Sequence, residues 1–184
     1  HNTAHNFKKV FWNRLEELNI DTHIIIGNHD TYYKNTNEVN ALQNLNISKD
    51  AKIYTRPDTV NFGGLDILFL PWICDDNYDD SLYAIDNSTT TIAMGHLEVK
   101  GFEMHKGHFN DHGLEKTQFN KFEKVLSGHF HKKSDDGRIY YLGTQYEITW
   151  SDYKCPKGFH IFDTETRELS RIENTNTIFK KIVY

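Results

Sequence analysis

The sequence predicts a mixed α/β fold in which sheets are covered by helices. Strand-like apolar runs alternate with helical patterns early in the chain and dominate its later part. The 184 residues, 38% of them hydrophobic and 14% aromatic, are long enough to bury one substantial core. No internal repeat, low-complexity tract or Pro/Ser linker divides the sequence. We therefore expect a single domain over residues 1–184.

The first predicted elements are a helix and a strand. Apolar residues recur at helical intervals from about Asn6 to Leu18, which predicts an amphipathic helix packed against a core. Residues Thr22–Ile26 follow as a buried strand. A second helix is predicted to start at Asn35, because Glu38 stands three residues on as in a capping box, and to run through Val39, Leu42 and Leu45.

A β-hairpin is predicted after the short strand Ile53–Tyr54. Two apolar runs, Val60–Phe62 and Leu65–Leu70, flank Gly63-Gly64, a dipeptide that allows the positive φ angles of a tight turn. The acidic stretch Asp75–Asp80 is interpreted as a solvated loop or the start of a helix and not as a metal site.

The second half of the chain is predicted to be rich in strands, with a helix near Lys116–Phe122. The predicted strands are Thr91–Met94, Lys124–Ser127, Ile139–Leu142, Gly158–Asp163 and Leu169–Ile172.

Composition limits the functional classes. The formal charge is -5 with no long Lys/Arg block, so any anionic substrate would need cations gathered locally. No apolar run approaches the roughly 18 residues needed to cross a bilayer, and a soluble, intracellular protein is expected. Cys74 and Cys155 are predicted to be unpaired thiols. The chain begins with His1 and not with Met, and we expect it to begin inside a longer protein.

One pattern occurs three times: an apolar strand, then a glycine, then a histidine at once or after one residue. The three segments are Gly27-Asn28-His29-Asp30, Gly95-His96 and Gly128-His129-Phe130-His131. Ligands of open α/β sheets bind where strands deliver their carboxyl ends into loops, so these segments are expected to converge on one site.

Imidazole and amide groups are suitable ligands for divalent ions such as Mn, Fe or Zn, and two such ions roughly 4 Å apart can clamp and hydrolyse a phosphoester. Each segment has a simpler interpretation. A lone Gly-His is most often a loop residue, and alternating histidines can share an exposed face. Gly-Asn-His-Asp is the most specific of the three, because it supplies a ligand, an acid and an orienting carboxylate in a row.

The order of these motifs resembles the calcineurin-like metallophosphoesterases, and within them the nuclease subunit of the DNA double-strand-break repair complex and its phage recombination exonuclease counterpart. The resemblance also covers Leu70-Pro71-Trp72, Gly143-Thr144 and Lys157-Gly158-Phe159. It implies a β-sandwich of mixed sheets flanked by helices. It also implies that Asn28, His96 and His129 bind one metal and His131 a second, while His29, oriented by Asp30, contacts the scissile phosphate or protonates the leaving group.

By the same resemblance the cofactors are two divalent metal ions, Mn²⁺ first among them. The implied partners are DNA and an ATPase subunit of the repair-complex type, with a homodimer as a further expectation and no membrane. The expected location is the cytoplasm, that of the host cell if the protein is phage-encoded.

The sequence also departs from this family. The Asp-x-His and Gly-Asp-x-x-Asp motifs of family members do not occur before Gly27, and residues His1 to Leu18 look like the helix that follows them. The chain is thus expected to lack its first strands and the bridging carboxylate, and to hold one metal ion or none. Three hypotheses stay open: a DNA exonuclease or endonuclease subunit, a nucleotide phosphodiesterase or phosphatase, and a catalytically silent binding or dimerisation module.

Overall fold

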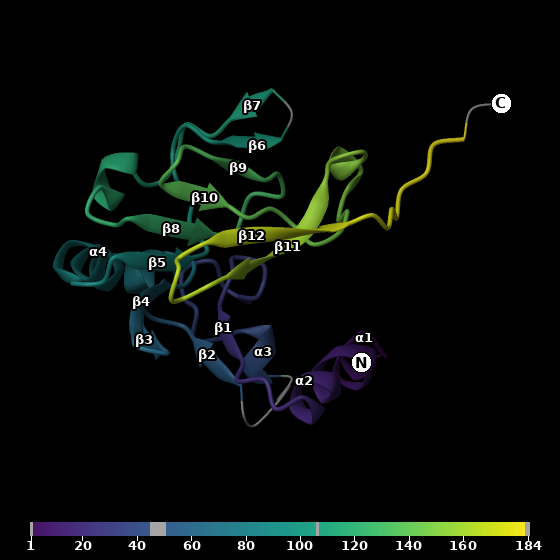
Figure 1. Ribbon diagram of the computed structural model, residues 1–184, viewed down its shortest axis with the longest axis horizontal. Coiled ribbons are helices and arrows are strands. Elements are labelled where there is room, and N and C mark those ends of the chain that lie inside the picture. The colour runs from purple at the N-terminus through teal and green to yellow at the C-terminus, as the bar shows by residue number, and fades with distance from the viewer. Residues whose placement is uncertain (1, 45–50, 106, 183–184) are drawn as a thin grey trace.

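The computed structural model describes residues 2–44, 51–105 and 107–182. It confirms a mixed α/β architecture built around a six-stranded sheet with the order β3-β4-β5-β8-β10-β9 (Figure 1). The strands of this sheet are β3 (Asp58–Phe62), β4 (Leu65–Leu70), β5 (Ile92–Gly95), β8 (Lys124–Ser127), β9 (Ser134–Asp135) and β10 (Ile139–Tyr141).

The four central strands of this sheet, β4, β5, β8 and β10, run parallel, and β3 and β9 pair with them antiparallel. The register pairs Leu70 with Gly95 and Gly95 with Ser127. The carboxyl ends of β4, β5 and β8 are therefore level, so the loops that follow them start side by side along one edge of the sheet.

Smaller sheets complete the fold. A parallel pair joins β1 (His23–Ile25) to β2 (Lys52–Tyr54), and antiparallel pairs join β6 (Glu103–His105) to β7 (His108–Phe109) and β11 (Lys157–Phe162) to β12 (Leu169–Asn174). Beyond β1, the chain is tied to the end of β4 by a 2.7 Å hydrogen bond from the Trp72 amide to the Ile26 carbonyl. These sheets are consistent with the predicted α/β class. The more specific prediction, a metallophosphoesterase β-sandwich, stays a prediction.

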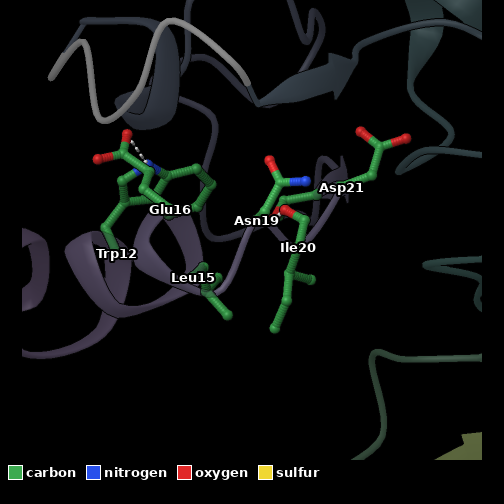
Figure 2. A pocket seen from close by; sticks show the side chains of 7 residues that line it. Trp12, Leu15, Glu16, Asn19, Ile20 and Asp21 are labelled. Carbon is green, nitrogen blue, oxygen red and sulfur yellow. Dashed lines mark hydrogen bonds between the residues drawn. The ribbon is translucent and has the colours of Figure 1, made fainter.

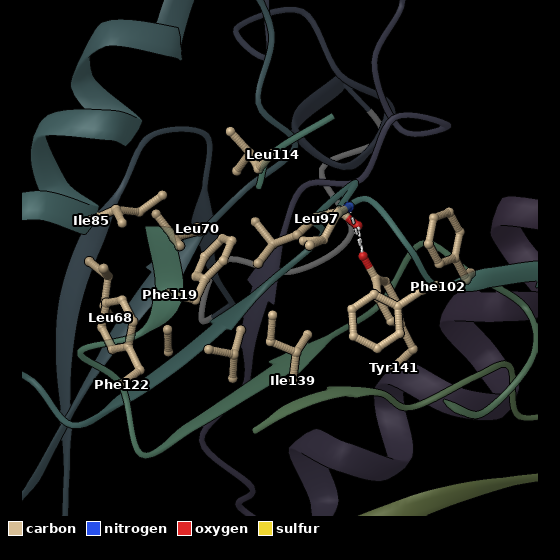
Figure 3. Close-up of a cluster of buried hydrophobic side chains, with 14 residues drawn as sticks. Leu68, Leu70, Ile85, Leu97, Phe102, Leu114, Phe119, Phe122, Ile139 and Tyr141 are labelled. Carbon is tan, nitrogen blue, oxygen red and sulfur yellow. Dashed lines mark hydrogen bonds between the residues drawn. The ribbon is translucent and has the colours of Figure 1, made fainter. Parts of the chain in front are cut away.

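Apolar side chains cover both faces of the central sheet. Along β4, Leu68 and Leu70 belong to the main cluster of buried residues, while Ile67 and Phe69 belong to a smaller one. This alternation is expected for a strand covered on both faces. Figure 3 shows the main cluster, in which the Tyr141 hydroxyl donates a 3.0 Å hydrogen bond to the Leu97 carbonyl and accepts one of 3.0 Å from the Val99 amide.

The main cluster also contains Ile85 of α4 (Tyr78–Asn87) and Phe119 of a short 3₁₀ helix, η3 (Lys116–Phe119). The acidic stretch is indeed the start of a helix, because η2 (Asp75–Asn77) leads into α4. The helix predicted near Lys116–Phe122 is only this 3₁₀ turn. The turn at Gly63-Gly64 is confirmed, with φ angles of 59° and 95°.

The N-terminal segment is helical, but the prediction that its apolar face packs against a core is wrong. It comprises α1 (Asn2–Phe7), a π-helical turn η1 (Lys8–Trp12) and α2 (Asn13–Glu17). Phe7, Val10 and Phe11 are 39%, 75% and 51% exposed, whereas Trp12 is 2% exposed. A π-helical turn shifts side chains relative to a regular α-helix. The prediction assumes the periodicity of a regular α-helix, so it assigns the wrong residues to the buried face.

Trp12 lines a cavity of about 340 Å³ between α2 and residues 19–22 (Figure 2). Its indole donates a 3.0 Å hydrogen bond to the carboxylate of Glu16. None of the predicted site residues lines this cavity.

The second predicted helix begins later than expected. Residues Asn35 to Val39 form bends and turns, and the helix is α3 (Ala41–Asn44). Asn40 and not Asn35 caps it, because the Gln43 amide donates to the Asn40 side-chain oxygen at 2.9 Å and the Asn40 amide group donates to the Gln43 side chain at 2.9 Å. The predicted continuation to Leu45 lies outside the described residues.

Cys74 and Cys155 are unpaired, as predicted. In the described part of the chain, no helix combines the length and the apolar character needed to cross a membrane.

Candidate metal and active site

The three glycine-histidine segments meet at one edge of the structure. Gly27-Asn28-His29-Asp30 follows β1, His96 follows β5, and His129 follows β8 by one residue. The His96 amide donates to the Leu70 carbonyl at 3.0 Å, and the Gly128 amide donates to the Gly95 carbonyl at 2.9 Å. These bonds extend the ladder beyond the strands and hold the two histidine loops against each other.

Two glycines leave room for the His96 ring. A Cβ atom at Gly27 would lie 2.8 Å from His96 Cε1, and one at Gly128 would lie 3.1 Å from His96 Nδ1. Glycine is therefore required at position 27 for close packing rather than for a special backbone angle. His129, in contrast, has a φ of 82°, a conformation uncommon for a residue with a side chain and one that clusters at functional sites.

The donor atoms of three predicted metal ligands converge. Asn28 Oδ1 lies 2.9 Å from His96 Nε2, and His129 Nδ1 lies 3.3 Å from the same nitrogen. Bonds of about 2.1 Å to a shared ion, at the angles of tetrahedral or octahedral coordination, place donor atoms about 3.0–3.4 Å apart. The observed separations fit donors to one ion, although the metal-binding role itself stays a prediction.

Both histidines are electrically neutral near pH 7. Burial, together with the smaller effects of the charges of His129 and His29, lowers the pKa of His96 to about 3. Burial also lowers the pKa of His129 to about 4, with contributions from His29 and His131. Trp72 provides part of the apolar cover, with its ring centroid 5.2 Å from that of His129. A neutral imidazole keeps a lone pair, which is the form that binds a metal.

His131 faces a different environment. Its Nδ1 lies 3.2 Å from Asp152 Oδ2, which places an Nδ1 proton to donate to this carboxylate and leaves Nε2 as the nitrogen that can bind a metal. Asp152 is 3% exposed and pairs with Lys157, also 3% exposed, at 2.8 Å between Oδ1 and Nζ. The Lys157 ammonium donates a further hydrogen bond of 3.0 Å to the His131 carbonyl.

The carboxylate of Asp152 is held in its charged form. Burial alone would raise the pKa of Asp152, but hydrogen bonds from Lys157 and from the backbone amides of Thr149 and Ile148, together with the Lys157 charge, keep it well below its usual range. Such a carboxylate behind a histidine fixes the tautomer and the ring orientation. The sequence does not predict Asp152 or Lys157 as site residues, although Lys157 belongs to the Lys157-Gly158-Phe159 motif.

His29 and Asp30 complete the predicted site. His29 is exposed and lines the same cavity as His129 and His131. The Asp30 carboxylate accepts a 2.8 Å hydrogen bond from the Gly27 amide and so closes the loop that presents His29. The orientation of the His29 ring by Asp30 and the contact of His29 with a substrate stay predictions.

The donors present fit one metal ion in kind and spacing, but they form an incomplete set. Within residues 2–44, 51–105 and 107–182, no three His, Cys, Asp or Glu side chains gather around one point. The cluster consists instead of two imidazoles and the amide of Asn28. Its donors are all neutral.

Comparison with known proteins shows similarity to a phage protein. No protein-family model matches the chain. Over 180 residues, 97% of its length, the chain is 37% identical to Exonuclease subunit 1 of Enterobacteria phage T4. The aligned region spans 52% of that relative. The chain is therefore related to a phage exonuclease subunit and corresponds to about half of it.

Proposed function

We propose that this chain supplies part of a metal-dependent centre that hydrolyses DNA phosphodiesters in recombination or repair, as an exonuclease or endonuclease subunit. The convergence of Asn28 Oδ1 and His129 Nδ1 on His96 Nε2, at 2.9 and 3.3 Å, carries the proposal. The similarity to an exonuclease subunit supports the choice of DNA over a small phosphoester.

Each residue has an assigned task in this proposal. Divalent ions, Mn²⁺ first among them, would polarise the phosphate and supply activated water when held by Asn28, His96 and His129 and, at a second position, by His131. His29, exposed at the cavity, contacts the phosphate or donates a proton to the leaving oxygen. Asp30 holds the loop of His29 in place through the Gly27 amide.

Metal stoichiometry and DNA cleavage, measured together, test the proposal. Elemental analysis after Mn²⁺ loading counts bound ions, and calorimetry gives their affinity. We expect His96→Gln to weaken Mn²⁺ binding by roughly tenfold or more, the loss seen even for outer partners of a metal site. His112→Gln is the matched control, because its side chain is 81% exposed and lies outside the cluster. Equal Mn²⁺ affinity in both variants would reject the metal site.

A silent binding or dimerisation module is the second candidate. It is favoured by the lack of a third His, Cys, Asp or Glu at the cluster in the described residues and by the exposed Phe7, Val10 and Phe11. Cleavage of linear duplex DNA by this chain with Mn²⁺ would reject the silent module. Binding of one ion or none, without cleavage, would support it.

The partners and the substrate class are proposals as well. The relative is named a subunit, which supports a partner chain, and the family resemblance points to an ATPase. Hydrolysis of small phosphoesters without cleavage of DNA ends would favour the phosphodiesterase or phosphatase alternative. A concentration-dependent mass in sedimentation experiments would support the homodimer.

A further inference from the structure

A cavity of about 430 Å³ lies between the central sheet and the hairpin formed by β11 and β12. Its wall combines Lys124 of β8 and Tyr140 of β10 with side chains of the hairpin. The Lys124 ammonium stands between these two layers, 5.8 Å from the ring centroid of Tyr140 and 5.7 Å from that of Phe162 in β11. It also donates a 2.6 Å hydrogen bond to the Arg167 carbonyl, in the loop that joins β11 to β12.

This cavity is separate from the histidine cluster. Lys124 is the first residue of β8, whereas His129 follows the carboxyl end of that strand. None of the residues predicted to bind metal or substrate lines the cavity. A ligand of this cavity would therefore be held by other groups than those of the proposed hydrolytic centre.

Positive charge predominates in the lining. Lys124, Lys133 and Arg171 are cationic at pH 7, and among the lining residues that the structure describes Glu168 is the one carboxylate. An excess of cations in a concave site attracts anions.

Two of these cations have carboxylates beside the cavity, but both pairs are long. The Lys133 ammonium lies 3.5 Å from the Asp135 carboxylate, and Arg171 Nη1 lies 4.0 Å from the Glu173 carboxylate. Both carboxylate side chains are more than one-third exposed. Pairs of this kind are weak, so both cations can bind a further anion.

The hairpin places two nitrogen-bearing side chains opposite each other in the wall. The register pairs His160 with Arg171, and both residues line the cavity. His160 Nε2 and Arg171 Nε are buried, and neither has a hydrogen-bond partner within the described part of the chain. Arg171 is anchored at another nitrogen, since Nη2 donates a 2.9 Å hydrogen bond to the Pro156 carbonyl. Buried donors are nearly always paired, so these two nitrogens favour an acceptor from outside the chain.

The charges around His160 favour the same kind of ligand. Burial is the largest cause of the lowered pKa of His160, and the positive charges of Arg171 and Lys133 act in the same direction. The imidazole is therefore neutral near pH 7 and has one N–H group to donate. An anion placed among these three side chains would interact favourably with both cations and accept that hydrogen bond.

We propose that this cavity binds a phosphate group, either inorganic phosphate or the terminal phosphate of a nucleotide, through Lys133, His160 and Arg171. Guanidinium groups match the geometry of phosphate oxygens, and lysine adds a point charge. The excess of cations suits a phosphate dianion better than the single charge of a phosphodiester. Because Arg171 and His160 belong to the hairpin and Lys133 lies beside β9, the bound group would tie the hairpin to the central sheet.

Calorimetry of the whole, metal-free chain with inorganic phosphate, at an ionic strength kept constant with chloride, tests this site. Arg171→Gln should weaken phosphate binding by roughly tenfold or more, the size of one hydrogen bond to a charged group. Lys133→Gln should weaken it by roughly 2- to 5-fold, because this side chain is 39% exposed. Lys52→Gln is the matched control: Lys52 is also exposed and paired with a carboxylate, Asp21 at 3.1 Å, but it lies outside the cavity.

Thermal unfolding gives a second measurement, because a ligand of the folded chain raises its Tm. Phosphate should raise the Tm of the wild type and of Lys52→Gln more than that of Lys133→Gln. Three further ligands identify the group that is recognised. Deoxyadenosine 5′-monophosphate should bind at least as tightly as phosphate, deoxyadenosine should not bind, and a dinucleoside monophosphate, which has only a diester, should bind more weakly.

The possible results separate this site from the proposed hydrolytic centre. No phosphate binding by the wild type, or equal affinity in the wild type, Arg171→Gln and Lys133→Gln, overturns the site. Binding that is lost in His96→Gln but kept in Arg171→Gln places the phosphate at the histidine cluster and also overturns it. If Arg171→Gln does not fold, Lys133→Gln decides. Phosphate binding that is weakened in Lys133→Gln and unchanged in His96→Gln supports the site, whether or not the chain cleaves DNA.

Discussion

The buried pair of Asp152 and Lys157 offers the clearest test of how His131, the predicted ligand of a second metal ion, is held in place. Asp152→Asn keeps the shape of the side chain and one acceptor oxygen but removes the charge. The pair is 2.8 Å long, and its two side chains are only 4% and 2% exposed, so neither charge is well screened by solvent. The variant therefore leaves the Lys157 ammonium buried with the His131 carbonyl, 3.0 Å away, as its other acceptor.

The expected decrease in the free energy of unfolding of Asp152→Asn is large compared with the total stability of a typical domain. Removing one partner of a buried ion pair costs about 3–5 kcal/mol, because it leaves an uncompensated charge. A typical domain is stable by about 5–15 kcal/mol, so the variant should unfold at a clearly lower urea concentration. Adding Lys157→Met removes the second charge, and the double variant should lose much less than the sum of the single losses.

Urea unfolding followed by tryptophan fluorescence measures these differences. Asp135→Asn is the matched control, because Asp135 forms a 3.5 Å pair with Lys133 in which both side chains are more than one-third exposed. That pair should contribute about 0–1 kcal/mol. If Asp152→Asn costs no more than this control, Asp152 does not hold a buried charge and the account of His131 orientation fails.

Three further predictions concern the core and the cluster. Tyr141→Phe should cost about 1–3 kcal/mol in urea unfolding, because a buried backbone amide and carbonyl lose their partner. Gly27→Ala should weaken Mn²⁺ binding in calorimetry, since its Cβ would lie 2.8 Å from His96 Cε1 and displace the ring. Gly64→Ala strains the hairpin turn at a φ of 95° but touches no histidine, so it should lower stability without weakening Mn²⁺ binding. Folding lowers the pKa values of His96 and His129 to about 3 and 4. As the pH falls, these two histidines are therefore protonated in the unfolded chain before they are protonated in the folded chain. The free energy of unfolding, measured in urea titrations, should therefore have its highest value above about pH 6.5 and fall toward pH 4. The decrease should be smaller in His96→Gln.

Local chemistry explains what the sequence could predict of the fold. Gly63-Gly64 between two apolar runs allows few structures other than a tight hairpin, and the turn is found there. Capping chemistry is less selective. The Asn35 and Glu38 pair and the Asn40 and Gln43 pair both have the right spacing, and only the packed structure shows that the second pair caps the helix.

The site was predictable to the extent that its residues stand at strand ends. Each of the Gly-His segments follows an apolar run, and parallel pairing in register brings the ends of β5 and β8 together. Asp152 gives no such signal. It lies in a 3₁₀ turn, η4 (Trp150–Asp152), and its importance follows from contacts with His131, 21 residues away in sequence, and with Lys157. Tertiary packing alone reveals it.

The electrical charge of the cluster limits what it can do. His96 and His129 are neutral at pH 7, and Asn28 is neutral at any pH, so a divalent ion bound among them keeps its full charge. Neutral donors hold such an ion less firmly than carboxylates do, but they leave more of its field for an anionic phosphate. The nearby Asp152 carboxylate does not change this balance, because the Lys157 ammonium neutralises it at 2.8 Å. A phosphodiester would therefore strengthen metal binding, and the metal would strengthen phosphodiester binding by the same factor.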